Sequence, residues 1–189
     1  MRFWTCAGPL TIVLACAACA HHAQGPSAHA EFSSDDAALF EDGVDLIEDP
    51  GQLEGQWKTD WDRDLDRRIA QADVIAVGTV TTLRADVDLD RRTSRHLVLA
   101  VERTLEGKAP SELILVSREG AAGYASIGDH SGDVLNRKLL AFVRYAAGPD
   151  DSVIAHFHLS VPSDTVLQRV DQYEAQKRPS QVQIIEHSN

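Results

Sequence analysis

Apolar residues recur at regular spacings from residue 58 onward, and these spacings predict a succession of helices and strands. Trp61, Leu65 and Ile69 fall on one stripe with charged residues between them, which predicts an amphipathic helix. Later segments are rich in β-branched residues and are bounded by turn residues, which is typical of strands. In chain order we expect a helix at 60–72, strands at 73–83, 95–105, 112–117, 138–145 and 152–160, and a closing helix at 163–176.

The predicted strands follow one another without helical crossovers. Gly78 stands in the middle of the first strand, where it predicts a bulge or a sharp bend. Five consecutive antiparallel strands suit a small closed barrel of the OB type. We therefore expect a mainly β fold, with a five-stranded antiparallel OB-like barrel between an N-terminal and a C-terminal helix. The glycine-rich stretch 119–136 is expected to be a long loop, and Val182–Ile185 could add an edge strand.

Negative charge is concentrated ahead of this domain. The net charge is −11, and the segment 31–57 holds nine acidic residues and no Lys or Arg. Because such a segment repels itself and has little apolar material, we expect residues 17–57 to be a disordered acidic tether with a reach of roughly 35 Å as a coil. The domain is then assigned to 58–178 and a tail to 179–189. A small group of apolar residues in the tether could instead dock on the domain or on a partner: Leu39, Phe40, Val44, Leu46 and Ile47.

The first twenty residues have the features of an export signal. A positive charge precedes a short apolar stretch, and small residues surround Cys16 and Cys19. Val13–Cys16 resembles the lipobox of bacterial lipoproteins, in which the cysteine is acylated. This resemblance makes residues 1–16 the signal peptide with its lipobox, and Cys16 the preferred lipid anchor. Cys19 is an alternative anchor, and an A-x-A site ending at Ala20 would instead remove residues 1–20 and release a soluble chain.

The placement of the cysteines supports a lipid anchor. No cysteine follows Cys19, and no later apolar run is long enough to cross a bilayer. Stray thiols are a liability in an oxidising compartment, so a thiol kept near the mature N-terminus fits lipidation. We expect the protein in the cell envelope, attached to the membrane through this lipid. Because Ala17 is not acidic, we expect the outer membrane facing the periplasm. The alternative is a soluble periplasmic or secreted protein.

His156 and His158 are the most suggestive chemical feature. On a strand, side chains two residues apart point to the same face, so both rings would lie together. Such a pair binds zinc or copper when a third ligand joins it, and His96 or His130 could supply that ligand. The alternative is the polar outer face of a strand. The serines, acids and histidine crowded into 119–136 indicate loop composition, because catalytic triads draw their members from separated parts of a fold. We expect no enzyme activity and no cofactor.

Several short motifs, taken in order, resemble a known module. Ala72–Ile75 opens the first predicted strand, Leu105–Lys108 closes the second, and Leu139–Phe142 lies in the fourth. With His158–Thr165 before the last helix, they resemble the netrin-like module, an OB-type barrel found in the tissue inhibitors of metalloproteinases and some complement proteins. The resemblance covers about 70–175 and implies that fold. It does not imply protease inhibition, because a charged helix stands where those inhibitors carry a metal-chelating cysteine.

Together these features predict a membrane-tethered binding module of the cell envelope that is not an enzyme. OB-type barrels bind along one face and its flanking loops, which here would be 84–94 and 119–136. The expected partner is an envelope protein and not a nucleic acid, because nucleic acids require a basic footprint that this chain lacks. The alternative is a metal-binding or metal-dependent protein that uses His156 and His158.

Overall fold

The computed structural model describes residues 31–149 and 152–186, with side chains through Lys177. The predicted signal, both candidate anchor cysteines and the first part of the tether lie outside these residues. The elements are α1 Ser34–Leu39, β1 Gly43–Asp45, the 3-10 helix η1 Pro50–Gln52, α2 Gly55–Gln71, β2 Val74–Val87, β3 Thr93–Glu106, β4 Glu112–Arg118, α3 Tyr124–Asp129, α4 Ser131–Val134, β5 Lys138–Ala147, β6 Val153–Ser160 and α5 Asp164–Glu186.

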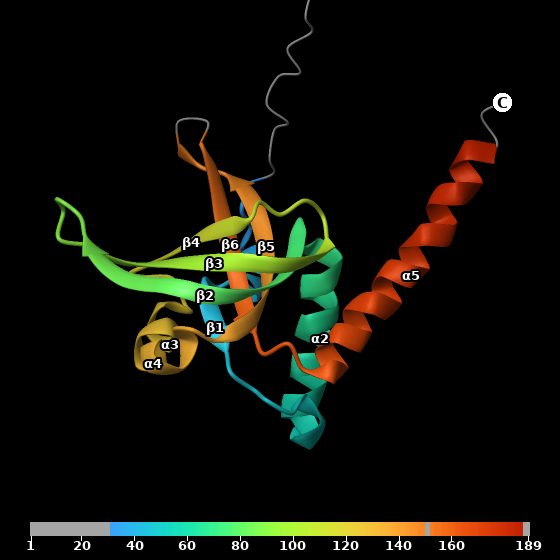
Figure 1. Cartoon of the computed structure of the whole chain (residues 1–189), viewed down its shortest axis with the longest axis horizontal. Helices are drawn as coiled ribbons and strands as arrows, with labels where there is room; N and C mark the ends of the chain where they lie inside the picture. Colours follow the sequence, from blue (N-terminus) through green and yellow to red (C-terminus); the bar gives the residue numbers. More distant parts are fainter. Residues whose placement is uncertain (1–30, 150–151, 187–189) are drawn as a thin grey trace, which may run out of the picture.

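The strands form one mixed sheet in the order β1-β6-β5-β2-β3-β4 (Figure 1). Strands β2 to β6 pair antiparallel with their neighbours, whereas β1 runs parallel to β6, with Gly43–Asp45 opposite His158–Ser160. The prediction of a mainly β chain with flanking helices is confirmed. The closed five-stranded antiparallel barrel is wrong. The sheet ends at β1 and β4, and β6 uses part of its outer edge for β1 instead of pairing with β4.

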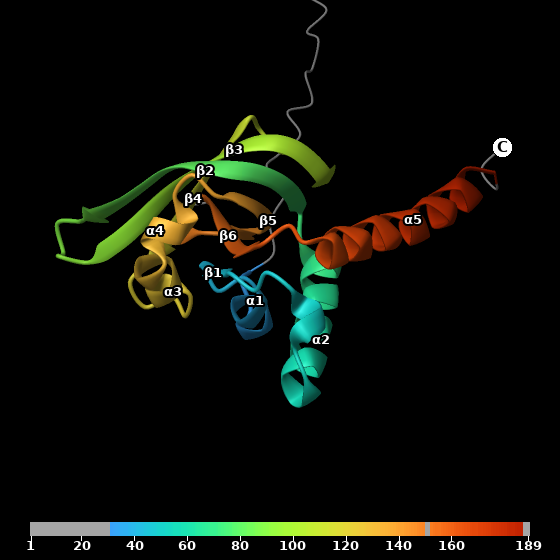
Figure 2. The same cartoon turned by 60° about the horizontal axis from the view of Figure 1, so that its bottom comes forward.

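The central strands bury side chains on both faces of the sheet. On β5, Leu139, Ala141 and Val143 belong to one apolar cluster, and Leu140 and Phe142 belong to the other. A strand buried on both faces needs a continuous apolar run, which explains the uninterrupted LLAFV sequence of β5. Helices α3 and α4 contribute to the first cluster, and α1, α2 and α5 to the second (Figure 2).

The β2–β3 hairpin extends beyond the body of the domain as an arm (Figure 1). The register of β2 against β3 shifts between Val77 and Gly78. A Cβ atom at Gly78 would lie 2.3 Å from the carbonyl oxygen of Ala100, so the close approach of the two strands requires glycine. The predicted bulge is therefore confirmed. The connection expected at 84–94 is mostly strand, with its turn at 88–92.

The acidic segment, residues 31–57, is folded against the sheet. Leu39 and Phe40 are each 1% exposed and belong to the second apolar cluster, while Val44 of β1 belongs to the first. For its described part, the prediction of a disordered tether is wrong, and the docking alternative drawn from these apolar residues is correct. The domain therefore extends back to residue 31 at least, and does not begin at residue 58.

Several acids of this segment find hydrogen-bond donors within the fold. Asp36 completes a capping box at the start of α1, and Asp45 accepts from the indole N–H of Trp61 at 2.9 Å. Glu41 and Asp42 contact the two histidines of β6. These individual contacts offset the repulsion between the acids that the charge count predicts. Counting charges could not show this, because several of the donors lie far away along the chain.

Two short helices occupy most of the stretch expected to be a long loop at 119–136. Ile127 of α3 and Val134 of α4 are completely buried in the first apolar cluster. Gly123 lies so close to β1 that a Cβ atom on it would be 2.3 Å from the Cα atom of Gly43. These glycines therefore permit backbone-to-backbone packing between the start of α3 and β1.

Both long helices are longer than predicted: α2 begins before residue 60, and α5 continues beyond residue 176. Glu54 occupies the N-cap position of α2 without a side-chain hydrogen bond, so the helix begins before the predicted residue 60. Helix α5 leads away from the sheet (Figures 1 and 2) and continues to Glu186. Residues 182–185 are therefore helical and do not add an edge strand, and much of the predicted tail is helix. None of the described helices has the length and apolarity needed to span a membrane.

Candidate functional site

The predicted histidine pair lies on β6, between the sheet and the acidic segment. His156 and His158 share one face, as their spacing predicts, and Phe157 points to the other face into the first apolar cluster. His158 is 2% exposed, and the side chain of His156 is 16% exposed. The sequence therefore predicted the orientation of the two rings, but the polar outer face considered as the alternative is largely covered.

Two consecutive carboxylates hold the histidines. Glu41 Oε1 lies 2.7 Å from Nδ1 of His158, and Asp42 Oδ2 lies 3.0 Å from Nδ1 of His156. Asp42 also accepts the amide N–H of Phe157 at 3.0 Å, and its own amide donates to the Phe157 carbonyl at 2.9 Å. Neither acid is predicted by local sequence patterns, because 117 and 114 positions separate them from their partners.

The other contacts of the histidines are also made within the fold. His158 Nε2 lies 3.0 Å from Oγ of Ser160, so both of its ring nitrogens have partners. Phe32 stacks on His156, with ring centroids 3.6 Å apart and planes inclined by 10°. A metal ion would have to displace Glu41 or Ser160 in order to bind His158.

The two histidines considered as third metal ligands lie elsewhere. His96 Nε2 is 3.0 Å from Ser94 Oγ and 3.5 Å from Asp86 Oδ2 in the β2–β3 arm. His130 Nδ1 is 3.5 Å from Asp133 Oδ2 in α4. Across residues 31–149 and 152–186, no three His, Cys, Asp or Glu side chains are placed to hold a metal ion. The structure does not bring the expected ligand set together.

A buried arginine lies on the other side of Glu41. Arg68 is 8% exposed; its Nε donates to the Leu39 carbonyl at 2.9 Å, and its Nη2 lies 3.9 Å from Glu41 Oε2. Burial raises the pKa of Glu41, but the hydrogen bond and charge of His158 and the charge of Arg68 outweigh it, so the pKa lies below its ordinary value. Burial also lowers the pKa of Arg68. The chain of contacts from Arg68 through Glu41 and His158 to Ser160 joins α2, the acidic segment and β6.

A hollow of about 320 Å³ opens beside these contacts. Among the residues that the structure describes, its lining offers no hydroxyl, thiol or amine nucleophile. Ser126 of the neighbouring α3 accepts the Val44 N–H at 3.0 Å and donates to the Gly123 carbonyl at 2.8 Å, which fastens α3 to β1. In the described part of the chain, these contacts engage Ser126 in packing and form no hydrolytic triad. The lining residues are Phe32, Ala37, Phe40, Glu41, Asp42, Gly120, Ala121, Ala122 and His156.

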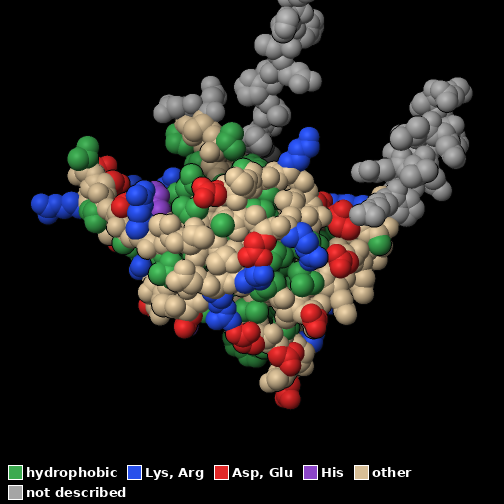
Figure 3. Space-filling model, viewed as in Figure 1, with side chains coloured by type: hydrophobic (Ala, Val, Ile, Leu, Met, Phe, Trp, Pro, Cys, Tyr) green, Lys and Arg blue, Asp and Glu red, His purple; other side chains and the backbone are tan. Residues whose placement is uncertain are grey.

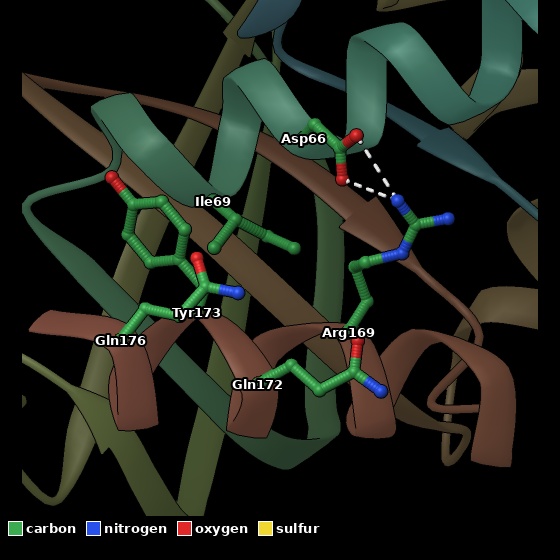
Figure 4. A pocket seen from close by; sticks show the side chains of 6 residues that line it. All are labelled: Asp66, Ile69, Arg169, Gln172, Tyr173 and Gln176. Carbon is green, nitrogen blue, oxygen red and sulfur yellow. Dashed lines mark hydrogen bonds and ion pairs between the residues drawn. The ribbon is translucent and has the colours of Figure 1, made fainter.

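A second hollow, of about 260 Å³, lies between α2 and α5 (Figure 4). Arg169 of α5 points across the gap and donates to both carboxylate oxygens of Asp66, at 2.8 and 3.0 Å. Ile69 and Tyr173 line the hollow beside this ion pair. The charge of Arg169 is matched within the domain, so this contact holds the two helices together.

A third hollow is an open groove of about 190 Å³ between β4 and β6. Its walls are Ile114, Val116 and Arg118 from β4 and residues 153–155 from β6. Ile114 is 67% exposed and Val153 is 53% exposed. Within the described residues β4 has one ladder partner, β3; its outer edge faces β6 across the groove without pairing with it. An open strand edge with exposed apolar side chains is a template for binding another strand.

No protein-family model matches this chain, and a search of curated proteins finds no significant match. The netrin-like resemblance therefore stays a prediction from short motifs. Function has to be argued from the geometry of the sites above.

Proposed function

We propose that the protein is a non-catalytic binding module of the cell envelope, attached by an N-terminal lipid to the outer membrane and facing the periplasm. The observation that carries this proposal is the exposed apolar groove along β4. The two candidate metal-binding histidines of β6 are meanwhile held by Asp42, Glu41 and Ser160. An open edge binds an extended segment through backbone hydrogen bonds, with side-chain contacts adding selectivity. The netrin-like resemblance supports the same function, because OB-type modules bind along one face and its flanking loops.

The start of the folded part limits the distance between the module and the membrane. With Cys16 as the lipid anchor, residues 17–30 connect the lipid to the domain. A chain of this length spans roughly 20 Å as a flexible coil and about 50 Å when fully extended. This reach is shorter than that of the tether expected from the sequence, so the module would be held close to the membrane surface.

The tip of the β2–β3 arm, where hydrophobic and charged side chains lie together on the surface (Figure 3), offers a second contact area. Val87 is 65% exposed and Leu89 fully exposed, and both lie in the connection 84–94 that the sequence analysis expects to bind. In the other expected connection, 119–136, Ile127 and Val134 face the core. Deleting 119–136 would therefore damage the fold, and single substitutions on β4 are the better test of binding.

Two measurements test the proposal separately. Mass spectrometry of the mature N-terminus is expected to find an acylated Cys16 or Cys19, and an unmodified chain beginning at His21 would reject the lipid anchor. A photo-crosslinking amino acid placed at Ile114 in the full chain is expected to capture a protein in the envelope. The same reagent at Leu135, another exposed apolar residue, is the control. Equal capture at both positions would reject β4 as the binding edge.

A further inference from the structure

We infer that β4 pairs with itself: two copies of the chain join through their β4 strands, antiparallel about a two-fold axis at Leu115. This inference rests on the proposed binding function, because it names a second copy of the chain as the partner. Three features of β4 carry it: the direction of its backbone groups, the exposure of its side chains and the order of its charges.

The backbone of β4 turns every second residue away from the sheet. The Glu119 amide donates to the Thr93 carbonyl at 2.9 Å, and the Val101 amide donates to the Ser111 carbonyl at 2.8 Å. On β4, the backbone N–H and C=O groups of the odd-numbered residues therefore point toward β3. The pairing of β4 with β3 has no register shift, so the alternation holds along the strand. The residues whose N–H and C=O groups point outward are Glu112, Ile114, Val116 and Arg118.

The same four residues carry the exposed side chains of β4. Burial alternates along the strand, with Leu113, Leu115 and Ser117 buried between more exposed neighbours. Neither Glu112 nor Arg118 has an ion-pair partner among the residues that the structure describes. The open edge therefore presents a negative end, an apolar centre and a positive end on one face.

This order is self-complementary when two β4 strands run antiparallel. With Leu115 of the two copies opposite each other, Glu112 faces Arg118 of the second copy at both ends, and Ile114 faces Val116 in the centre. The Arg118 carbonyl already accepts the Ala121 amide at 2.9 Å, so the four outward residues give about six backbone hydrogen bonds across the axis. Opposite charges and apolar side chains are the favourable cross-strand pairs. Shifting the register between the two β4 strands by two residues would lose the ion pairs. Shifting it by one residue would place outward-pointing backbone groups of one copy opposite inward-pointing groups of the other.

The groove supplies further apolar surface to a second copy. Val153 of β6 lies along the other wall of the groove and is 53% exposed. A strand that covers Ile114 would also shield Val153 from water and would remove the open edge. Attachment to one membrane raises the effective concentration of the copies, so a small interface is sufficient there.

Cysteine crosslinking tests the register in the full chain. One tagged copy carries Ile114→Cys, a second copy with a different tag carries Val116→Cys, and both are produced together in the envelope and oxidised. Directly paired residues lie about 5.5 Å apart between Cα atoms, within disulfide range, whereas diagonal neighbours lie about 7–8 Å apart. We expect the mixed dimer to form severalfold more than either like-with-like dimer. Copies carrying Leu89→Cys at the arm tip, together with the unsubstituted chain, measure the background.

Charge reversal tests the ion pairs in the same assay. Glu112→Arg or Arg118→Glu alone sets like charges opposite each other at both ends, which should lower mixed crosslinking on the order of tenfold. The double variant Glu112→Arg with Arg118→Glu restores opposite charges and should restore crosslinking. Asp90→Arg, an exposed reversal at the arm tip, should leave it unchanged. Restored crosslinking in the double variant would show that the single variants lose the pairing between copies and not the fold of the domain.

Two results would overturn the inference. Mixed crosslinking no higher than the Leu89 background would exclude β4 self-pairing, and equal crosslinking in every combination of cysteines would exclude the register. Capture of a different protein from Ile114, without a mixed dimer, would also reject a second copy as the partner while leaving the proposed binding function intact. Loss of the lipid anchor would not affect crosslinking between copies at high expression. A failure of the proposed lipid attachment can therefore be distinguished from a failure of β4 self-pairing.

Discussion

Phe40→Ala tests whether the acidic segment belongs to the fold. The Phe40 side chain is 1% exposed and lies in the apolar cluster covered by α1, α2 and α5. Truncating such a side chain costs about 3–5 kcal/mol, because transfer free energy is lost and a cavity remains. Domains of this kind have a total free energy of unfolding of about 5–15 kcal/mol, so the variant should lose a large fraction of it. In a disordered tether the same substitution would have almost no effect.

Urea unfolding of the full chain, followed by circular dichroism, measures this loss. With a slope of about 1–3 kcal/mol per molar urea, the midpoint should fall by about 1–5 M and the slope should stay unchanged. Trp57→Ala is the matched control: it removes another aromatic side chain from the acidic segment, but one that is 80% exposed. It should change the free energy of unfolding by less than about 0.5 kcal/mol. Equal midpoints for Phe40→Ala and the unsubstituted chain would refute the reasoning.

Four further predictions concern the contacts of His158 and Glu41, the bulge in β2 and the metal content of the protein. His158→Ala leaves Glu41 without its donor and should lower the free energy of unfolding by about 1–3 kcal/mol in the same urea assay. The pKa of Glu41 lies below its ordinary value of 4.5. Its contribution to the free energy of unfolding is therefore present above pH 4.5 and is lost as the pH falls through the lower pKa. Glu41→Gln should make the free energy of unfolding, measured by urea titrations at several pH values, fall less steeply in acid. Gly78→Ala places a Cβ atom against the Ala100 carbonyl and should cost about 1–3 kcal/mol, whereas Gly132→Ala, with open space around it, should cost far less in thermal unfolding. Protein purified without a tag should contain no stoichiometric zinc or copper by elemental mass spectrometry, and His156→Ala should not change that content.

Local patterning predicted most of the elements. The spacing of Trp61, Leu65 and Ile69 identified α2, and the short β-branched runs identified β2 to β6 close to their observed bounds. Gly78 marked the bulge in β2. These predictions succeeded because periodicity and glycine positions record burial and backbone conformation, which are local properties of the chain.

The contacts at the candidate site depend on partners that local patterning cannot identify. Glu41 belongs to a run that composition alone assigns to a disordered tether, and only its pairing with His158, 117 positions away, reveals its place in the fold. The closed barrel failed for a related reason. The parallel pairing of Gly43–Asp45 with β6 comes from that same acidic segment, and three residues leave too short a pattern to predict a strand.

The central claim is that the acidic segment is an ordered part of the domain, bound to β6. Amide hydrogen exchange of the full chain tests this most directly, because the Asp42 amide donates to the Phe157 carbonyl at 2.9 Å and the Val44 amide donates to Ser126 Oγ at 3.0 Å. We predict that these two amides are protected to the same degree as the paired amides of β5 and β6. Exchange of Asp42 and Val44 at the rates of an unstructured peptide, with β5 and β6 still protected, would contradict the account.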